Sequence, residues 1–467
     1  MPTQPINFIR GDAVDSDTDY KDALPVNMMA IMRDTFGYAG YMLQYPGLKD
    51  CRRASGVDRG GIFDSRRKRH YRVSGQKLIE VNGGVTDLGA ITGTDQAQFA
   101  YSFNNLAVVA GGKMWLYSPS GGFRQITDPD LGNPIDICWV DQYFFMTDGE
   151  NLFHTQIDDE SKIRPTDFAT SEFSPDPTYG VEKTVDNRVM VFNRYSCEFF
   201  QNTAKEDFAF SRLNGYTLEI GIVGTDAKAP MQDGFICVGN RKEEAVSVWL
   251  LSGTRAKNLA TRQIEKVIGQ YNDNELRNVK VETLEREGYQ YAIIHLPNET
   301  ILLNFTVATG AGVGNAWSTL KSDVQGETQY RAHNGVFDAN HGRWIYGDKF
   351  SNRLGELDDT TGTHYGQLTE WELYTPFYPV ESASIDEVEI KNIPGFNQAD
   401  DATIAVSFTY DGYQYGKEKF LKYGKPLHYG DRFIGRRFGY VREYFGMKLR
   451  GANTSRIALG AGVFKYG

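Results

Sequence analysis

The chain has 467 residues, which exceeds the usual size of a single hydrophobic core, so two or three domains are expected. Aromatic residues make up 13% of the sequence and glycines number 49, a composition that is typical of strands and turns and too apolar for a disordered protein. The net charge of −10 argues against a surface built to hold phosphates, although it is compatible with a wall past which DNA slides.

Signals for export, membrane insertion and disulfide formation are missing from the sequence. The first residues, MPTQPINFIRGDAVDSD, lack the pattern of a signal peptide, and no apolar run approaches the roughly 20 residues that cross a bilayer. We therefore expect synthesis and folding in the cytosol, and no membrane segment. Buried free thiols are expected, rather than disulfides or a metal site, because no CxxC pair occurs among the four cysteines: Cys51, Cys138, Cys197 and Cys237.

Residues 1–60 are predicted to form an extended N-terminal arm. Within it, DSDTDY (15–20) has aspartates at positions one, three and five of a calcium-binding loop. Position six of that loop should be Gly and is Tyr20, and position twelve should be Glu and is Val26. A solvated acidic arm is therefore the preferred interpretation.

A hairpin pattern repeats after residue 60. Three segments place two short apolar runs on either side of a glycine turn: HYRVSGQKLIEV (70–81), NLAVVAGGKMWLYSPSGGFRQIT (105–127) and YFFMTDGENLFHTQI (143–157). Both spacings between the turn glycines Gly75, Gly112 and Gly149 are 37 residues. Strand-forming runs around such turns indicate hairpins, and a fixed period of about 40 residues is typical of a propeller.

The series continues less regularly to residue 360. Four further hairpins, which bring the number to seven, turn near Arg194, Arg241, Asn298 and Lys349. We interpret each hairpin as the inner half of a four-stranded blade, with shorter pieces such as 123–127 and 317–321 as outer strands. The sequence therefore predicts a six- or seven-bladed β-propeller over residues 61–360. The alternative fold for this region is a large irregular β-sandwich rich in hairpins.

Two departures from the hairpin pattern are predicted. A helical insertion at about 261–278 has Ile264, Val267, Ile268 and Tyr271 on one face, so we expect it to lie against the propeller rim. After residue 360 the strands become longer and alternate in polarity, and residues 361–467 are predicted to be a separate C-terminal β-sandwich-like domain. The fold class is therefore all-β.

Motifs of catalysis and cofactor binding are incomplete. TGAGVGNAW (309–317) nearly spells the dinucleotide fingerprint, but its last glycine, Gly314, is one place early and an aromatic strand follows where a helix is needed, so we interpret it as a loop. No P-loop, HExxH or GxSxG pattern occurs, the seven histidines never have metal-ligand spacing, and the 60 carboxylates single out no glycosidase pair. We predict no catalytic, cofactor-binding or metal-binding residue and no enzyme activity.

Two basic clusters stand out on this acidic chain: SRRKRHYR (65–72) and RRFGYVREYFGMKLR (436–450). In the second, aromatic residues interleave with five cations, which are the candidate interface residues: Arg436, Arg437, Arg442, Lys448 and Arg450. Such a mixture could stack on bases or clamp a nucleic-acid backbone, or it could be an amphipathic strand pair. A docking face for a sister subunit or another neighbour is the preferred interpretation.

A resemblance to a known family rests on eight segments in the same order: DALPVNMMA (22–30), GYMLQYPGL (40–48), GVDRGGIF (56–63), YRVSGQKL (71–78), IEKVIGQYNDNEL (264–276), IIHLP (293–297), DGYQYGKEK (411–419) and GRRFGYVREYFGMKLR (435–450). They resemble the tail-nozzle proteins of short-tailed double-stranded DNA phages, also called tail-hub or packaged-DNA stabilisation proteins. Residues 90–253 match that family in little beyond their hairpin rhythm.

The resemblance implies a subunit of the virion tail, made in the host cytoplasm and assembled as a ring of six below the portal and its adaptor. The ring would continue the DNA channel without sequence specificity, retain packaged DNA and serve as the conduit for ejection. It would also seat a needle or plug and carry tailspikes or fibres. The alternative function is a carbohydrate-binding or carbohydrate-active propeller, because propellers often present ligand sites in their central channel.

Overall fold

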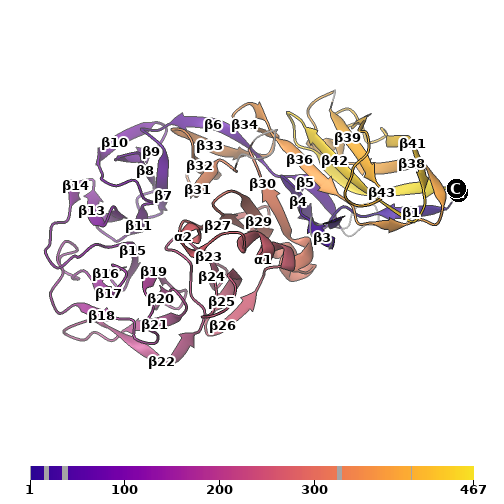
Figure 1. Ribbon diagram of the computed structural model, residues 1–467. Helices are drawn as coiled ribbons and strands as arrows, with labels where there is room; N and C mark the ends of the chain where they lie inside the picture. The colour runs from indigo at the N-terminus through magenta and orange to yellow at the C-terminus, as the bar shows by residue number, and fades with distance from the viewer. Residues whose placement is uncertain (1, 15–19, 34–39, 323–328, 401) are drawn as a thin grey trace.

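The computed structural model describes residues 2–14, 20–33, 40–322, 329–400 and 402–467. The described chain is elongated, with a β-propeller at one end and a β-sandwich at the other (Figure 1). Three short α-helices are the only α-helices among these residues, so the predicted all-β class is confirmed.

Seven sheets surround the propeller axis, and the first six have four strands each in chain order. The first three blades are β7 (Asp58–Asp64), β8 (Arg69–Ser74), β9 (Lys77–Val81) and β10 (Val85–Ala90); β11 (Gln98–Tyr101), β12 (Leu106–Ala110), β13 (Lys113–Ser118) and β14 (Gly122–Gln125); and β15 (Asp136–Val140), β16 (Tyr143–Thr147), β17 (Asn151–His154) and β18 (Phe168–Thr170).

The next three blades follow the same plan. They are β19 (Thr178–Lys183), β20 (Val189–Asn193), β21 (Cys197–Asn202) and β22 (Phe210–Leu218); β23 (Lys228–Met231), β24 (Gly234–Gly239), β25 (Ser247–Ser252) and β26 (Arg255–Asn258); and β27 (Lys280–Arg286), β28 (Tyr289–His295), β29 (Thr300–Asn304) and β30 (Trp317–Leu320). The first strands of most neighbouring blades contact one another around the axis, so each blade begins at its inner strand.

The seventh blade closes the ring by joining the two ends of the propeller. Its inner strands are β31 (Ala332–Asp338), β32 (Arg343–Asp348) and β33 (Arg353–Asp358), and its fourth strand is β6 (Gly47–Arg53), with the small β34 (Thr363–His364) and β35 (Gln367–Leu368) beyond it. β6 pairs antiparallel with β33, and Leu48 lies opposite Leu357. The propeller therefore has seven blades.

The second strand of a blade is buried on both of its faces, which explains the continuous apolar runs in the sequence. In β12, Leu106 and Val108 pack in the core between blades 1 and 2, whereas Ala107 and Val109 pack in the core between blades 2 and 3. A strand with apolar neighbours on both sides has no solvent-facing position at which a polar residue would be favoured.

The predicted hairpins are present, but their place within the blade differs from the expectation. All seven are formed by the second and third strands of a blade, not by the inner two, whereas 123–127 and 317–321 do supply outer strands. The inner strands escaped notice because they face the axis and carry polar residues, as in DRGGIFD and TYGVEK. The charged groups of the inner strands are buried as pairs at the axis. These strands therefore lack the apolar runs by which the second and third strands were recognised in the sequence.

The three glycines with the 37-residue spacing occupy equivalent turns. Gly75, Gly112 and Gly149 lie between the second and third strands of blades 1, 2 and 3. Their φ angles are +57°, +67° and +103°, a backbone conformation that glycine adopts without steric cost.

The predicted helical insertion consists of two short helices between blades 5 and 6. α1 (Arg262–Ile268) is capped by Thr261 and buries three of the four predicted positions, Ile264, Val267 and Ile268. α2 (Asp273–Leu276) begins at a capping box formed by Asn272 and Glu275. The interruption follows Gly269, a poor helix former. A third helix, α3 (Phe305–Gly310), and the short 3₁₀ turns Val313–Asn315 and Pro394–Phe396 were not expected.

The C-terminal sandwich consists of two sheets. One has the order β4 (Met28–Ile31), β5 (Tyr41–Gln44), β43 (Ala458–Tyr466), β38 (Ala383–Asn392) and β41 (Phe433–Val441), with β1 (Thr3–Ile6) also paired to β43. The other has the order β36 (Glu370–Tyr374), β42 (Tyr444–Ala452), β39 (Thr403–Thr409) and β40 (Lys419–Lys422), with β37 (Tyr378–Pro379) also paired to β42. The small sheet of β2 (Gly11–Val14) and β3 (Tyr20–Ala23) lies apart from both.

The strands of residues 1–60 are shared between the two domains. β1, β4 and β5 belong to the sandwich, and β6 belongs to the propeller (Figure 1). At the junction, the Asn27 side chain donates to the carbonyl groups of Lys321 at 3.0 Å and Glu370 at 2.7 Å, which ties the segment before β4 to blade 6 and to β36. Buried Arg456 of the sandwich forms an ion pair with Asp359 at 2.6 Å.

Candidate functional site

A hollow of about 780 Å³ opens on the propeller axis at the end where the inner strands begin. Its lining includes the following charged residues: Asp58, Arg59, Asp95, Asp226, Arg277, Lys280 and Lys349. The three carboxylates all accept hydrogen bonds: Asp58 from Arg72, Asp95 from Arg59 and Asp226 from Gln98.

Side chains from opposite sides of the propeller meet across the axis. Gln98 of blade 2 donates to the Asp226 carboxylate, which precedes blade 5, at 3.0 Å. Lys280 of blade 6 lies 3.9 Å from the same carboxylate and also hydrogen-bonds to Asn334 of blade 7. A smaller hollow of about 290 Å³ shares Gln98, Asp226 and Lys280 with the first, so these side chains lie between the two. The axis is therefore closed by side chains.

A buried ion pair within the first blade is hydrogen-bonded to the last blade. Arg72 and Asp58 form a two-bonded pair at 2.7 and 2.8 Å, and both side chains are almost completely buried. Asn334 of blade 7 donates to Asp58 at 2.8 Å, and its carbonyl accepts from Arg72 at 2.7 Å. A charge buried in this way needs its partner, because an unpaired charge in the interior is costly.

Glu282 links blades 6 and 7 beside the hollow. Its carboxylate accepts from the backbone N–H groups of Asn334 at 2.6 Å and Gly335 at 3.0 Å. Burial opposes its ionisation, but the His295 ring, whose Nε2 lies 3.3 Å away, together with Lys280 and the backbone N–H groups outweighs burial and holds the pKa of Glu282 well below its usual range. Burial, assisted by nearby Lys349, lowers the pKa of His295 to about 4.

Further ionisable groups near the axis are shifted by burial. The pKa of Lys349 is lowered to about 8, because burial disfavours its charged form. Burial also raises the pKa of Glu182 to about 7, against the attraction of Lys228. Lys228 itself forms a buried ion pair with Asp136 at 2.8 Å. The inner strands thus keep their charges in pairs and networks that join blades to one another.

The described part of the chain contains neither a cluster of metal ligands nor a cysteine pair. No group of three or more His, Cys, Asp or Glu residues that could hold a metal ion occurs there. The four cysteines are free, and burial raises the pKa of Cys138, Cys197 and Cys237. Most of the calcium-like motif DSDTDY lies outside the described residues. The longest α-helix described has seven residues, and no described helix is long and apolar enough to span a membrane.

The five candidate interface cations are divided between paired and unpaired positions. Three form ion pairs within the sandwich: Arg436 with Glu387 at 2.9 Å, Lys448 with Glu372 at 2.6 Å, and Arg450 with Glu370 at 2.8 Å. Arg437 and Arg442 are exposed and have no carboxylate within 4.0 Å among the described residues. Whether these cations form an interface stays a prediction.

The aromatic residues of the same cluster follow the alternation of an amphipathic strand pair. Phe438 and Phe445 are buried in the sandwich core, whereas Tyr440 is 58% exposed. The cluster has four rings, Phe438, Tyr440, Tyr444 and Phe445, and two of them are therefore not available for stacking on bases.

An exposed apolar edge was missed by the sequence analysis. β40 and β41 are the last strands of the two sheets, and with the adjoining loops they expose six large apolar side chains: Tyr410, Tyr413, Phe420, Leu427, Tyr429 and Tyr440. We call residues 410–443 the open edge. The alternation of lysines and aromatics in YGKEKFLKYGK is the signal that could have drawn attention to it.

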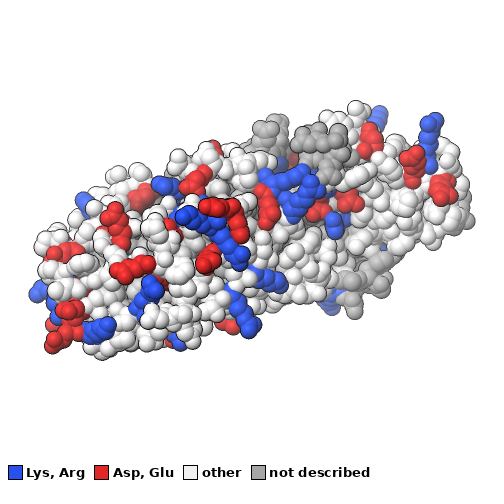
Figure 2. Space-filling view, turned by 60° about the horizontal axis from the view of Figure 1, so that its bottom comes forward, with Lys and Arg blue, Asp and Glu red and all other residues white. Residues whose placement is uncertain are grey.

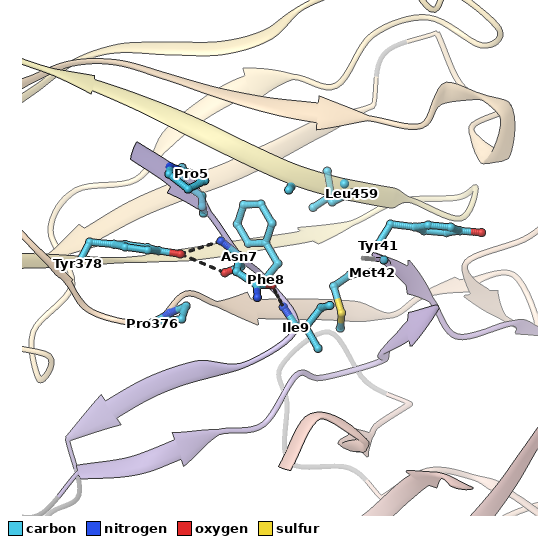
Figure 3. Close-up of a pocket in the computed structure, with 13 residues that line it drawn as sticks. Pro5, Asn7, Phe8, Ile9, Tyr41, Met42, Pro376, Tyr378 and Leu459 are labelled. Carbon is cyan, nitrogen blue, oxygen red and sulfur yellow. Dashed lines mark hydrogen bonds between the residues drawn. The ribbon is translucent and has the colours of Figure 1, made fainter. Parts of the chain in front are cut away.

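A small apolar pocket of about 360 Å³ lies where the N-terminal strand crosses the sandwich (Figure 3). Phe8, Met42 and Leu459 are among its lining residues, and the Tyr378 hydroxyl accepts from the Asn7 backbone N–H at 2.7 Å. Its lining carries no ionisable group other than the phenols, so it can accommodate apolar groups but offers no acid–base chemistry.

Charge is mixed on the face of the molecule that Figure 2 shows. Lysine and arginine side chains lie among aspartates and glutamates, without a large field of one sign on that face (Figure 2). Binding to a nucleic-acid backbone requires clustered cations, which this face does not present.

Two families match the chain, one for each domain. The family described as "Bacteriophage P22 Gp10, beta-propeller" matches residues 4–362, and the one described as "Bacteriophage P22 Gp10, beta-sandwich" matches residues 370–464. Tail hub protein gp10 of Salmonella phage P22 is 27% identical over 477 residues, which cover 98% of this chain and 98% of the relative.

Solved structures that are similar to part of the chain have low sequence identity to it. A streptogramin B lyase is 11% identical, with a TM-score of 0.45 over 67% of this chain and 97% of its own. A virginiamycin B lyase from Staphylococcus aureus is 12% identical, with a TM-score of 0.45 over 67% and 98% of the two chains.

Proposed function

Because this chain belongs to the bacteriophage P22 Gp10 family in both its propeller and its sandwich, we propose that it is a tail-hub subunit that extends the DNA channel below the portal and adaptor. In this role it retains the packaged genome and serves as the conduit during ejection. The observation that carries the proposal is the match to a tail hub protein over 98% of both chains. The chain acts as a structural component of the virion tail and not as an enzyme.

The proposed DNA channel is the space enclosed by a ring of subunits, with six as the expected number. The propeller axis is crossed by Gln98, Asp226 and Lys280, so a duplex cannot follow it. A ring places many copies of one rigid wall around a common passage, and closed rings are a usual outcome when identical subunits assemble.

Rigidity and low affinity for DNA suit such a wall. Each blade is braced by its neighbours through buried apolar cores and through hydrogen bonds such as that from Asn334 of blade 7 to Asp58 of blade 1. The net charge of −10 gives weak affinity for the DNA backbone, whereas tight phosphate contacts would slow the genome on ejection. The expected partners are further copies of the chain, the portal adaptor, a needle or plug, and a tailspike or fibre.

The proposal is tested by DNA retention. Particles assembled without this protein should package DNA and then lose it, and addition of the purified protein should restore retention. The DNA content of such particles is measured before and after complementation. Full retention without the protein would assign the seal to the adaptor or the plug and would contradict the proposal.

A further inference from the structure

The charge of the chain is concentrated in two regions of opposite sign. Residues 126–219, which contain the strands of blades 3 and 4, include 18 aspartates and glutamates but only 7 lysines and arginines, a net charge of −11. Residues 402–467 include 12 lysines and arginines and 4 aspartates and glutamates, a net charge of +8. Residues 361–401 of the same domain include 8 aspartates and glutamates and 1 lysine, a net charge of −7, so the excess of cations belongs to the last strands of the sandwich and not to the domain as a whole. The two regions lie at opposite ends of the elongated molecule (Figure 1).

At the basic end, the open edge carries cations that the fold leaves unpaired. Five of them have no carboxylate within 4.0 Å among the described residues: Lys417, Lys422, Lys425, Arg437 and Arg442. Lys419 ties β40 to β41 by donating to the Arg436 carbonyl at 3.0 Å. The Tyr410 hydroxyl donates to the Phe438 carbonyl at 2.9 Å, which brings the 410–418 loop onto the same edge.

The open edge also has the apolar content of a contact surface. Phe420 is 70% exposed and Tyr440 is 58% exposed, and an unpaired strand edge with exposed aromatic groups is a liability unless a partner covers it. Arg437 has a φ of +61° in an irregular stretch of β41, a strained conformation for arginine. Glycine at this position would relieve that strain.

At the acidic end, the outer side of blades 3 and 4 has complementary groups. Three apolar side chains are exposed there, Ile157, Phe168 and Phe173, together with four carboxylates that have no lysine or arginine within 4.0 Å among the described residues: Asp158, Glu172, Glu206 and Asp207. We call these seven residues the acidic rim. The Arg164 side chain donates to the Glu206 carbonyl at 2.8 Å, which joins the loop of blade 3 to that of blade 4.

We propose that the open edge of one chain docks on the acidic rim of a second copy. Unpaired cations and aromatic groups on one surface face unpaired carboxylates and apolar groups on the other, so the contact is favourable in both charge and desolvation. Because the two surfaces differ and lie at opposite ends of the chain, the contact is head-to-tail, and such contacts generate closed rings when the rotation between copies closes. The inference rests on the ring of the proposed function and names the surfaces that hold it together.

The test is a charge swap on particles that lack the protein. The edge variant carries Arg437→Glu and Arg442→Glu, the rim variant carries Glu172→Lys and Glu206→Lys, and a third chain carries all four changes. Copies of the protein per particle are counted after purified protein is added at a series of concentrations. Either pair alone should raise the concentration needed for full rings at least tenfold, and the four changes together should restore it, because the reversed edge then meets a reversed rim.

A matched control separates docking from folding. Lys113→Glu with Lys257→Glu reverses two exposed cations of blades 2 and 5 outside both surfaces and should leave the copy number unchanged. Each variant is also checked for an unaltered melting temperature as a monomer. Raising the salt to about 0.5 M shortens the screening length to a few ångströms and should weaken wild-type docking. Docking of the four-change chain should weaken to the same extent, because its contact has the same number of opposite charges.

Three results would overturn the inference. Full rings from both the edge and the rim variants would place the contact elsewhere. Loss of assembly in the edge variant alone would mean that the edge docks on another tail protein, and failure of the four-change chain to recover would exclude the pairing of these two surfaces. DNA retention, measured on the same particles, reports separately on the proposed function: rings without any effect on retention would contradict that function and leave the docking intact.

Discussion

The propeller axis and the open edge of the sandwich are both rich in charged side chains. Those at the axis are buried and paired, whereas many of those at the open edge are exposed and, among the described residues, unpaired. At the axis, Arg72 and Lys228 are buried against the carboxylates of Asp58 and Asp136. At the open edge, Arg437 and its unpaired neighbours face solvent with no carboxylate within reach among the described residues.

The difference separates charges that hold the fold from charges that are free to bind. A buried ion pair is satisfied within the chain, and breaking it costs stability because one charge is left without water or a partner. An exposed cation contributes little to folding, so its removal is expected to affect association instead. The hollow at the axis has the volume of a ligand site, but its three carboxylates already accept hydrogen bonds from within the chain.

The largest expected loss of stability comes from removing the buried ion pair at the propeller axis. Arg72→Met leaves Asp58 buried without its cation and should lower the free energy of unfolding by about 3–5 kcal/mol. Urea unfolding of the purified chain measures the loss, with Arg437→Met as the matched change at the open edge, for which we expect less than about 0.5 kcal/mol. Equal losses from the two variants would mean that the axis pair does not stabilise the propeller.

Acid is expected to weaken the propeller next. Burial lowers the pKa of His295 to about 4 and that of His364 to about 3, so between about pH 6.5 and these values the unfolded chain binds protons that the folded chain does not. The free energy of unfolding should therefore be highest above pH 7 and fall as the pH drops toward 4, by about 1.4 kcal/mol per pH unit for each histidine. Glu182, whose pKa burial raises to about 7, acts in the opposite direction and offsets the share of one histidine as the pH falls from about 7 to 4.5. Urea unfolding at several pH values measures the slope.

A histidine variant sharpens the pH comparison. His364→Gln removes one of the buried groups and should make the stability profile between pH 6 and 4 less steep, whereas Arg437→Gln at the open edge should leave the slope as it is. An unchanged slope in His364→Gln would assign the acid sensitivity to other groups.

Substitutions at two positions with positive φ are expected to change stability by smaller amounts and in opposite directions. Gly112 at the mouth of the axis has a φ of +67°, and the nearest atom to an added Cβ is 3.4 Å away, so Gly112→Ala should cost about 1–2 kcal/mol through backbone strain alone. Arg437→Gly should instead stabilise the monomer by up to about 1 kcal/mol. Thermal unfolding compares the two; a destabilised Arg437→Gly monomer would show that the arginine supports the fold.

The smallest effect on folding is expected from the exposed rings. Phe420→Ser with Tyr440→Ser removes apolar groups that solvent already reaches, so the free energy of unfolding should change by less than about 0.5 kcal/mol. The same variant should assemble poorly on particles, because the apolar part of the proposed contact is lost. Normal assembly would restrict the contact to its charges.

Local sequence patterns were sufficient to predict much of the architecture. The second and third strands of each blade were predictable because they are buried on both faces and therefore apolar, and because glycine turns such as those at Gly75 and Gly112 join them. The amphipathic face of α1 and the alternating strands of the sandwich were equally local. The family resemblance, carried by eight ordered segments, is confirmed by matches to both domains.

Only the tertiary structure decided which polar residues are buried and which strands are partners across long distances. The inner strands carry charges that become tolerable once Asp58 meets Arg72 and Glu282 meets His295, and sequence reasoning missed these strands for that reason. β6 pairs with β33, which lies about 300 residues later in the chain, and no local sequence pattern near either strand predicts that pairing. The same holds for the open edge: a run of alternating lysines and aromatics has the same pattern whether its aromatic face is covered or exposed, and coverage is decided by strands that come from elsewhere in the chain.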